Sequence, residues 1–231
     1  MRNITIAIDG YSSTGKSTIA KQVAKELSYV YVDSGAMYRA VSLYALQNNF
    51  INDKAFNVND FVKELDNIEL SFVFSPSLGF SEIYLNGINV EKEIRTMEVS
   101  NVVSRVSEIP EVRRQLVLQQ QNMRKQGGIV MDGRDIGTVV FPEAELKLFM
   151  TASPEIRAQR RYDELIKRGD EVEFDEVFKN VQERDYIDSH REDSPLIKAE
   201  DAIEIDNSSL TLKEQYHRIM DMVTMTLEGF E

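Results

Sequence analysis

The segment Ile4-Thr-Ile-Ala-Ile-Asp-Gly10-Tyr-Ser-Ser-Thr-Gly15-Lys16-Ser17 joins a short apolar run to a glycine-rich loop, and this combination decides the fold. The loop fits the pattern G-x-x-x-x-G-K-[ST], whose glycines let successive backbone N–H groups turn toward an anion. A strand must precede such a loop and a helix must follow it. Both conditions hold, because residues 3–9 are typical of a buried strand and residues 17–27 carry apolar side chains at helical spacing. The segment therefore predicts a phosphate loop that binds a nucleoside triphosphate.

The chemistry of this loop assigns roles to its residues. We expect Lys16 to reach the β- and γ-phosphate oxygens, and the Ser17 hydroxyl to ligate Mg²⁺. The helix that starts near Lys16 adds the positive end of its dipole. The residues predicted to bind ATP are Gly10, Tyr11, Ser12, Ser13, Thr14, Gly15, Lys16, Ser17 and Thr18.

Composition narrows the class of protein. The chain has 231 residues, 42% of them hydrophobic and 29% charged, which is enough for one sizeable core. It has no cysteine and two histidines, so we expect neither disulfides nor a zinc centre. A net charge of −12 argues against nucleic-acid binding, and the absence of a long apolar span argues against a membrane segment. We expect a cytoplasmic, untargeted protein whose partners are small molecules.

Strand and helix patterns alternate along the chain, as in a parallel sheet covered by helices on both faces. We predict one phosphate-loop domain over residues 1–231, of the α/β class with a five-stranded parallel sheet. The predicted strands are 3–9, 29–33, 128–132, 145–150 and 201–205, and the predicted helices are 17–27, 36–48, 99–108, 110–125, 154–168, 173–190 and 212–227.

One region departs from this alternation. Ile68, Leu70, Phe72 and Phe74 alternate with polar residues, and an Asn-Gly pair follows a second short apolar run. Asn-Gly flanked by alternating apolar residues is a strong hairpin signal. We predict a small antiparallel insert at about 66–92. A decorative insertion is the alternative to a role in binding substrate.

Basic residues cluster in the second half of the chain. Arg184, Asp188 and Arg191 are spaced i, i+4 and i+7, which places them on one side of a helix over 173–190. Arginine grips phosphate with paired donors, and an adjacent aspartate can accept hydrogen bonds from sugar hydroxyls. Taken alone, a surface ladder of salt bridges explains this spacing better. The phosphate loop elsewhere in the chain is what favours a binding site.

Two further motifs follow predicted strands. Residues 33–39 read Asp-Ser-Gly-Ala-Met-Tyr-Arg, and residues 127–142 run from Gly-Gly through Asp132-Gly-Arg134-Asp135 to Pro142. Turns at the carboxyl ends of parallel strands face the ligand crevice. Each motif could be an ordinary turn with a capping aspartate, but two of them beside a phosphate loop favour a site.

With these motifs, the sequence closely resembles the bacterial cytidylate kinases, or CMP kinases, of the nucleoside monophosphate kinase group. The resemblance runs nearly end to end, and it rests on the phosphate loop and on the motifs at 33–39, 93–96, 132–142 and 184–191. It implies transfer of the γ-phosphoryl group of ATP to CMP or dCMP, with Mg²⁺. It also implies a monomer, a nucleoside-monophosphate-binding region at about 34–108 that includes the antiparallel insert, and a helical lid at about 154–175.

The resemblance carries roles onto individual residues. Arg39, Arg134 and Arg184 would hold the acceptor phosphate, with Ser34 beside it. Ser104, Arg113 and Asp135 would read the cytosine, Asp188 would contact the sugar, and Arg191 would close that side of the pocket. Arg157 and Arg161 would reach the transferred phosphoryl group from the lid. The predicted catalytic residues are Lys16, Arg134, Arg157, Arg161 and Arg184.

Asp135 bears on which base the acceptor carries, and other sequence features bear on the alternative functions. A carboxylate at Asp135 that accepts from the cytosine 4-amino group would disfavour uracil, which has a carbonyl oxygen there. The family commonly has proline where this chain has Tyr11, and small residues at Ser13 and Thr14, so rate and donor preference are open. Another small-molecule kinase, of the UMP or shikimate type, remains an alternative. A nucleotide-switched binding protein is less favoured, because the sequence has no Asn-Lys-x-Asp motif for guanine.

Overall fold

The computed structural model describes residues 3–52, 54–124 and 128–229. These residues form two compact units, which we describe separately. Unit 1 comprises the described residues of Met1–Val32 and Met123–Glu231, and unit 2 is Asp33–Asn122.

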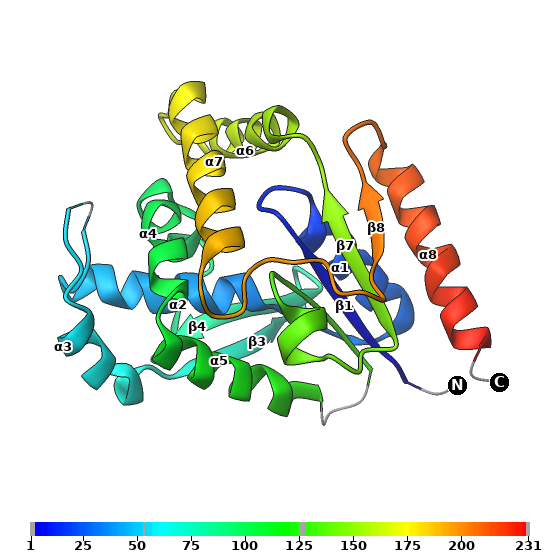
Figure 1. Ribbon diagram of the computed structural model, residues 1–231, viewed down its shortest axis with the longest axis horizontal. Coiled ribbons are helices and arrows are strands. Elements are labelled where there is room, and N and C mark those ends of the chain that lie inside the picture. The colour runs from blue at the N-terminus through cyan, green and yellow to red at the C-terminus, as the bar shows by residue number, and fades with distance from the viewer. Residues whose placement is uncertain (1–2, 53, 125–127, 230–231) are drawn as a thin grey trace. The chain divides into compact units, whose positions relative to one another are not determined.

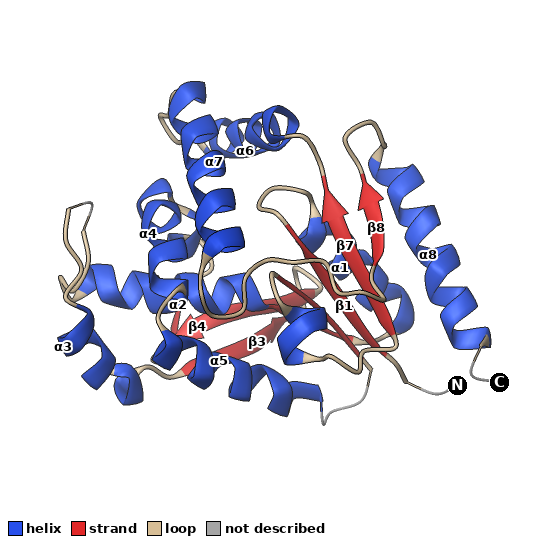
Figure 2. Ribbon diagram, in the orientation of Figure 1, coloured by secondary structure: helices blue, strands red, loops and turns tan. Residues whose placement is uncertain are grey.

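Unit 1 contains a five-stranded sheet in the order β2-β6-β1-β7-β8, of which β1, β7 and β8 are labelled in Figures 1 and 2. The central strand β1 pairs in parallel with β6 on one side, where Ile8 faces Asp132, and with β7 on the other, where Gly10 faces Met150. β7 pairs in parallel with β8. The strands span Thr5–Gly10 (β1), Val30–Asp33 (β2), Ile129–Gly133 (β6), Leu146–Thr151 (β7) and Ile203–Asp206 (β8).

Alternation along β1 separates two differently covered faces of this sheet. Ile6 and Ile8 belong to a core cluster that also contains Ile19 of α1 and Ile219 of α8, so these two helices cover one face. The opposite face receives Asp9, whose side chain meets a π-helical turn at Ile136–Val140. The helices of unit 1 are α1 (Lys16–Leu27), α6 (Pro154–Arg168), α7 (Phe174–His190) and α8 (Leu212–Glu228).

Unit 2 combines helices with a small antiparallel sheet. The order of this sheet is β3-β4-β5, and its second turn contains Asn86 and Gly87, both with positive φ. Asn-Gly suits such a turn because both central positions need φ above zero. Its elements are α2 (Ser34–Gln47), α3 (Val58–Lys63), β3 (Leu70–Ser75), β4 (Phe80–Leu85), β5 (Ile88–Asn89), α4 (Met97–Ser107) and α5 (Pro110–Met123).

The structure confirms the predicted fold class. All five predicted core strands are present, with ends that differ by one or two residues, and the antiparallel insert lies within 66–92. The last residue of the predicted helix 110–125 and Gly127 of the second motif lie outside the described residues. Among the residues that the structure describes, no helix has both the length and the apolar character needed to span a membrane.

Candidate active site

The phosphate loop follows β1 and leads into α1, as its motif requires. Gly10 has φ of 144°, and a Cβ atom placed on it would lie 2.0 Å from the backbone oxygen of Met150. No residue with a side chain fits there without moving the neighbouring strand. Gly15 has φ of 85° and precedes the first residue of α1. The two glycines thus meet a steric need at one end of the loop and a conformational need at the other.

The ammonium group of Lys16 lies inside the loop. Its Nζ donates to the backbone oxygen of Tyr11 and to Thr14 Oγ1, the latter at 3.3 Å. Burial, followed by the charge of Arg134, lowers the pKa of Lys16 from its ordinary value to about 7. A negatively charged group placed beside Lys16 would favour its protonated form. This environment suits an anionic ligand.

A hydroxyl at the start of α1 and a carboxylate of β6 form a pair of oxygen donors suited to a magnesium ion. Ser17 Oγ lies 2.9 Å from Asp132 Oδ2, and the other carboxylate oxygen accepts a hydrogen bond from Tyr31 at 2.8 Å. A loop hydroxyl and a carboxylate from a neighbouring strand are the ligands that hold Mg²⁺ in phosphate-loop enzymes. We did not assign this role to Asp132 from the sequence. Its position at the carboxyl end of the strand next to β1 was the available signal.

The far end of the loop is fixed by Asn207, which follows β8. Its Nδ2 atom donates to the backbone oxygen of Thr14 at 2.7 Å and to Gln215 Oε1 at 3.0 Å. Its Oδ1 atom and its backbone oxygen accept from the two terminal nitrogens of Arg160, each at 2.9 Å. Asn207 is 1% exposed. One amide therefore ties the loop to α6 and α8.

Asp9 links the strand before the loop to the segment that carries Asp135. Its two carboxylate oxygens accept from the backbone N–H groups of Ile136 at 2.8 Å and Gly137 at 2.7 Å. Burial raises the pKa of Asp9 to about 7, although both hydrogen bonds act in the opposite direction. The carboxylate fixes the start of the π-helical turn directly after Asp135.

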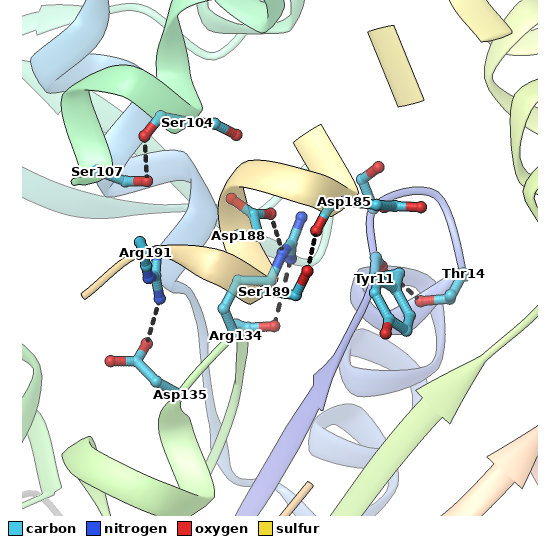
Figure 3. A network of polar contacts seen from close by, with 12 residues as sticks. Tyr11, Thr14, Ser104, Ser107, Arg134, Asp135, Asp185, Asp188, Ser189 and Arg191 are labelled. Atoms are coloured by element: carbon cyan, nitrogen blue, oxygen red, sulfur yellow. Dashed lines mark hydrogen bonds and ion pairs between the residues drawn. The ribbon is translucent and has the colours of Figure 1, made fainter. Parts of the chain in front are cut away.

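A charged cluster gathers around Asp188 of α7 (Figure 3). Arg134 Nε donates to Asp188 Oδ2 at 2.8 Å. Burial would raise the pKa of Asp188, but the guanidinium groups of Arg134, Arg184 and Arg191 hold it below its ordinary value. The structure thus brings together the three residues spaced i, i+4 and i+7. Arg191 Nη2 lies 4.0 Å from Asp135 Oδ1, and this second buried pair is also shown in Figure 3.

Arg184 has charged neighbours of both signs, and burial dominates its pKa. Burial, followed by the repulsion of Arg134 and Arg161 and despite the attraction of Asp188, lowers the pKa of Arg184 to about 10. Arg184 and Arg134 also lower the pKa of Lys16. Lys16 of the phosphate loop therefore interacts electrostatically with Arg134, which follows β6, and with Arg184 of α7. A multiply charged anion is the ligand that relieves this repulsion.

Helix α6 supplies the two remaining arginines predicted in unit 1. Arg157 is 2% exposed and forms a two-point pair with Asp185 of α7, with Nη1 2.9 Å from Oδ1. Arg161 is 8% exposed and pairs with Glu164 at 2.9 Å. The role of Asp185 was not predicted from the sequence, although it lies inside a motif that we quoted.

The other predicted substrate residues lie in unit 2. Ser34 is the first residue of α2, and Arg39 of the same helix donates to the backbone oxygen of Ile94 at 3.1 Å. Ser104 and Arg113 both contact Ser107. The Ser107 hydroxyl donates a 2.8 Å hydrogen bond to the backbone oxygen of Ser104. Arg113 donates to the backbone oxygen of Ser107 at 3.3 Å.

The start of α2 is held by an ion network that we did not predict. Asp33 accepts from the backbone N–H of Ala36 at 2.9 Å, which caps the helix, and its other oxygen pairs with Arg95 at 2.8 Å. Arg95 also pairs with Glu91 at 2.8 Å. The motif at 93–96 thus holds the helix that carries Ser34 and Arg39.

These features define a class of protein. A phosphate loop with a buried lysine, a serine–aspartate pair suited to Mg²⁺ and a cluster of buried and half-buried arginines together make a P-loop phosphotransferase site. The chain belongs to the cytidylate kinase family, whose model, described as "Cytidylate kinase", matches residues 6–225.

Similar proteins agree with this assignment. A protein named "Cytidylate kinase" from Flavobacterium psychrophilum is 65% identical over 223 residues, which cover 96% of this chain and 99% of that protein. One of the same name from Flavobacterium johnsoniae is 64% identical, covering 96% and 97% of the two chains. One from Bacteroides fragilis is 56% identical, covering 95% and 96%.

Proposed function

We propose that this protein transfers the γ-phosphoryl group of ATP to CMP and dCMP, forming CDP or dCDP and ADP. Family membership over most of the chain supports the reaction. The structural observation that carries the proposal is the phosphate loop with Lys16 buried inside it, together with the half-buried Arg134 and Arg184, whose charges act on Lys16. A donor triphosphate and an acceptor phosphate are anions that these cations would attract.

The reaction needs positioning and charge neutralisation more than proton transfer. The attacking oxygen belongs to a phosphate that is already anionic, so no general base is required. Lys16 would neutralise charge on the donor phosphates, while Arg134, Arg184 and Arg39 would hold the acceptor phosphate in line. When bound at Ser17 and Asp132, Mg²⁺ would supply further charge neutralisation.

The remaining roles are proposed from the family resemblance. Ser104, Arg113 and Asp135 read the cytosine, Asp188 contacts the sugar, and Ser34 and Arg191 complete the acceptor site. Arg157 and Arg161 act on the transferred phosphoryl group. We also propose that the protein works in the cytoplasm as a monomer. Size-exclusion chromatography with light scattering tests the oligomeric state.

The proposed reaction is tested by ADP release from ATP and Mg²⁺ with CMP, dCMP, UMP, AMP and shikimate in parallel. We expect strong turnover with CMP and dCMP and little with the other three. Comparable turnover with UMP would retain a kinase but contradict selection of cytosine. If none of the five acceptors is phosphorylated, the proposal is wrong.

A variant of Asp188 and a matched control test whether the charged cluster around Asp188 is needed for activity. Asp188→Asn keeps the shape of the side chain and removes the charge that orients Arg134. We expect it to reduce kcat/KM for CMP strongly. Asp163→Asn is the control, because Asp163 is exposed on α6 and hydrogen bonds only Gln159 among the contacts of the described residues.

A further inference from the structure

Arg157 of α6 does not extend into solvent, because its side chain is almost entirely buried. Its Nε donates to the backbone oxygen of Ala152 at 2.9 Å, and Nη1 donates to that of Ser12 at 3.3 Å. Both terminal nitrogens bind the carboxylate of Asp185 on α7. The guanidinium group therefore contacts the phosphate loop, the segment between β7 and α6, and α7 at once.

The face of the same guanidinium group is covered by Tyr11. The Arg157 Cζ atom lies 5.1 Å from the centre of the Tyr11 ring, within the range of a cation–π contact. The ring of Phe149, at the end of β7, meets the Tyr11 ring edge-on, with 6.2 Å between the centroids. Tyr11 thus stands between a strand of the sheet and Arg157, where its orientation is restricted from two sides.

We propose that Tyr11 and Asp185 are positioning residues that hold Arg157 against the phosphate loop, so that its guanidinium group is already oriented when it meets the donor phosphates. The inference rests on the proposed function and deepens it. The two hydrogen bonds to Asp185 fix the position of the guanidinium edge. The contact with the Tyr11 ring fixes the orientation of the guanidinium plane. Loss of the ring keeps the hydrogen bonds of Arg157 but removes the contact that restrains its plane on the side of Tyr11.

A double-mutant cycle tests this coupling. The four proteins are the wild type, Tyr11→Leu, Arg157→Met and the double variant, and kcat/KM for ATP is measured at saturating CMP. We expect Tyr11→Leu to lower kcat/KM about 2- to 30-fold, the range that a cation–π contact supports. We expect it to change kcat/KM less than about 2-fold when Arg157 is already methionine. KM for CMP should not change with Tyr11→Leu.

Two variants separate positioning from a general effect on stability. Tyr11→Phe keeps the aromatic face and should recover most of the activity that Tyr11→Leu loses. Tyr186→Leu makes the same change on the exposed side of α7, where Tyr186 stacks on His190, and should leave kcat/KM as in the wild type. An equal loss from Tyr11→Leu in both Arg157 backgrounds, or a loss in Tyr11→Phe as large as in Tyr11→Leu, would overturn the proposal.

The same cycle is run on the dissociation constant for ATP, measured by calorimetry without an acceptor. This readout does not depend on which acceptor the protein uses. If the wild type fails to phosphorylate CMP, the proposed function is wrong, but the coupling between Tyr11 and Arg157 can still be read from ATP binding. Additive changes in that constant would overturn the positioning role whatever the acceptor.

Discussion

Asp135 is a buried carboxylate, and Arg191 Nη2 lies 4.0 Å from its Oδ1 atom. We expect Asp135→Ala to raise the use of UMP relative to CMP, because it removes the group that accepts from the cytosine 4-amino group. A well-placed base contact gives about 1–3 kcal/mol of discrimination, so the ratio of kcat/KM values should shift by about 5- to 150-fold. Steady-state kinetics with both acceptors measure this ratio.

The control for this prediction keeps the acceptor but changes its charge. Asp135→Asn retains a carbonyl oxygen, so it should shift the CMP-to-UMP ratio less than Asp135→Ala. An unchanged ratio in Asp135→Ala would remove base reading from this residue.

Asp9 should make stability depend on pH. Burial raises its folded-state pKa from 3.8 to about 7, so between these values the native protein binds the proton more tightly than the unfolded chain does. The contribution of Asp9 to the free energy of unfolding therefore falls as pH rises from about 4 to 7, and is constant above that.

The comparison of the wild type with Asp9→Asn isolates this effect, because the variant lacks the titrating group. From pH 5 to pH 8 the wild type should lose about 2–3 kcal/mol more unfolding free energy than Asp9→Asn. Urea denaturation at both values measures the difference. A difference that is independent of pH would contradict the raised pKa.

At the scale of elements, α2 depends on Arg95, which neutralises Asp33 at its first turn and Glu91 beyond. Arg95→Ala leaves two carboxylates with little exposure and without this partner. We expect it to lower the free energy of unfolding by about 2–4 kcal/mol, since breaking a largely buried pair is costly. Chemical denaturation measures this loss.

Arg114→Ala is the matched control, because Arg114 pairs with Glu111 on an exposed face of α5. Exposed pairs contribute only about 0–1 kcal/mol, so this variant should unfold nearly as the wild type does. Equal losses in the two variants would show that the Arg95 network does not stabilise α2.

Local pattern predicted most elements, and distant contacts explain the rest. Apolar runs and the glycine-rich loop were sufficient for the strands and for α1. The segment after Asp135 contains β-branched residues suited to a strand, yet it forms a π-helical turn because Asp9, far away in sequence, binds its first two N–H groups. The helix α3 has six residues, too few for a clear periodic signal.

In the candidate site, too, residues of a contiguous motif were predicted, whereas contacts between distant elements were not. Lys16 and Ser17 were identified by a motif that is contiguous in sequence. The partners Asp132 and Asp185 were not assigned roles, because each acts on a residue from a different element. The contact of Tyr11 with Arg157 could not be predicted either, since nothing in the spacing of these residues reveals that α6 returns to the loop.

At the scale of the whole molecule, the net charge of −12 contrasts with the buried cations of the site. The charge is carried by exposed acidic residues, so it should govern solubility and not substrate binding. We expect a solubility minimum near the isoelectric point of about 4.8. Precipitation measured from pH 4 to pH 8 at low salt checks this, and a minimum near neutral pH would contradict it.

Asn207 has a consequence for how long the protein keeps working after it is made. A side-chain amide is chemically labile on storage and heating, and hydrolysis would replace the nitrogen of Asn207 by a carboxylate oxygen. That oxygen would face the backbone oxygen of Thr14 and the side-chain oxygen of Gln215, which now accept from the nitrogen. Hydrolysis of this one amide would thus loosen the phosphate loop. We expect the burial of Asn207 to slow this hydrolysis and so to prolong the activity of the enzyme.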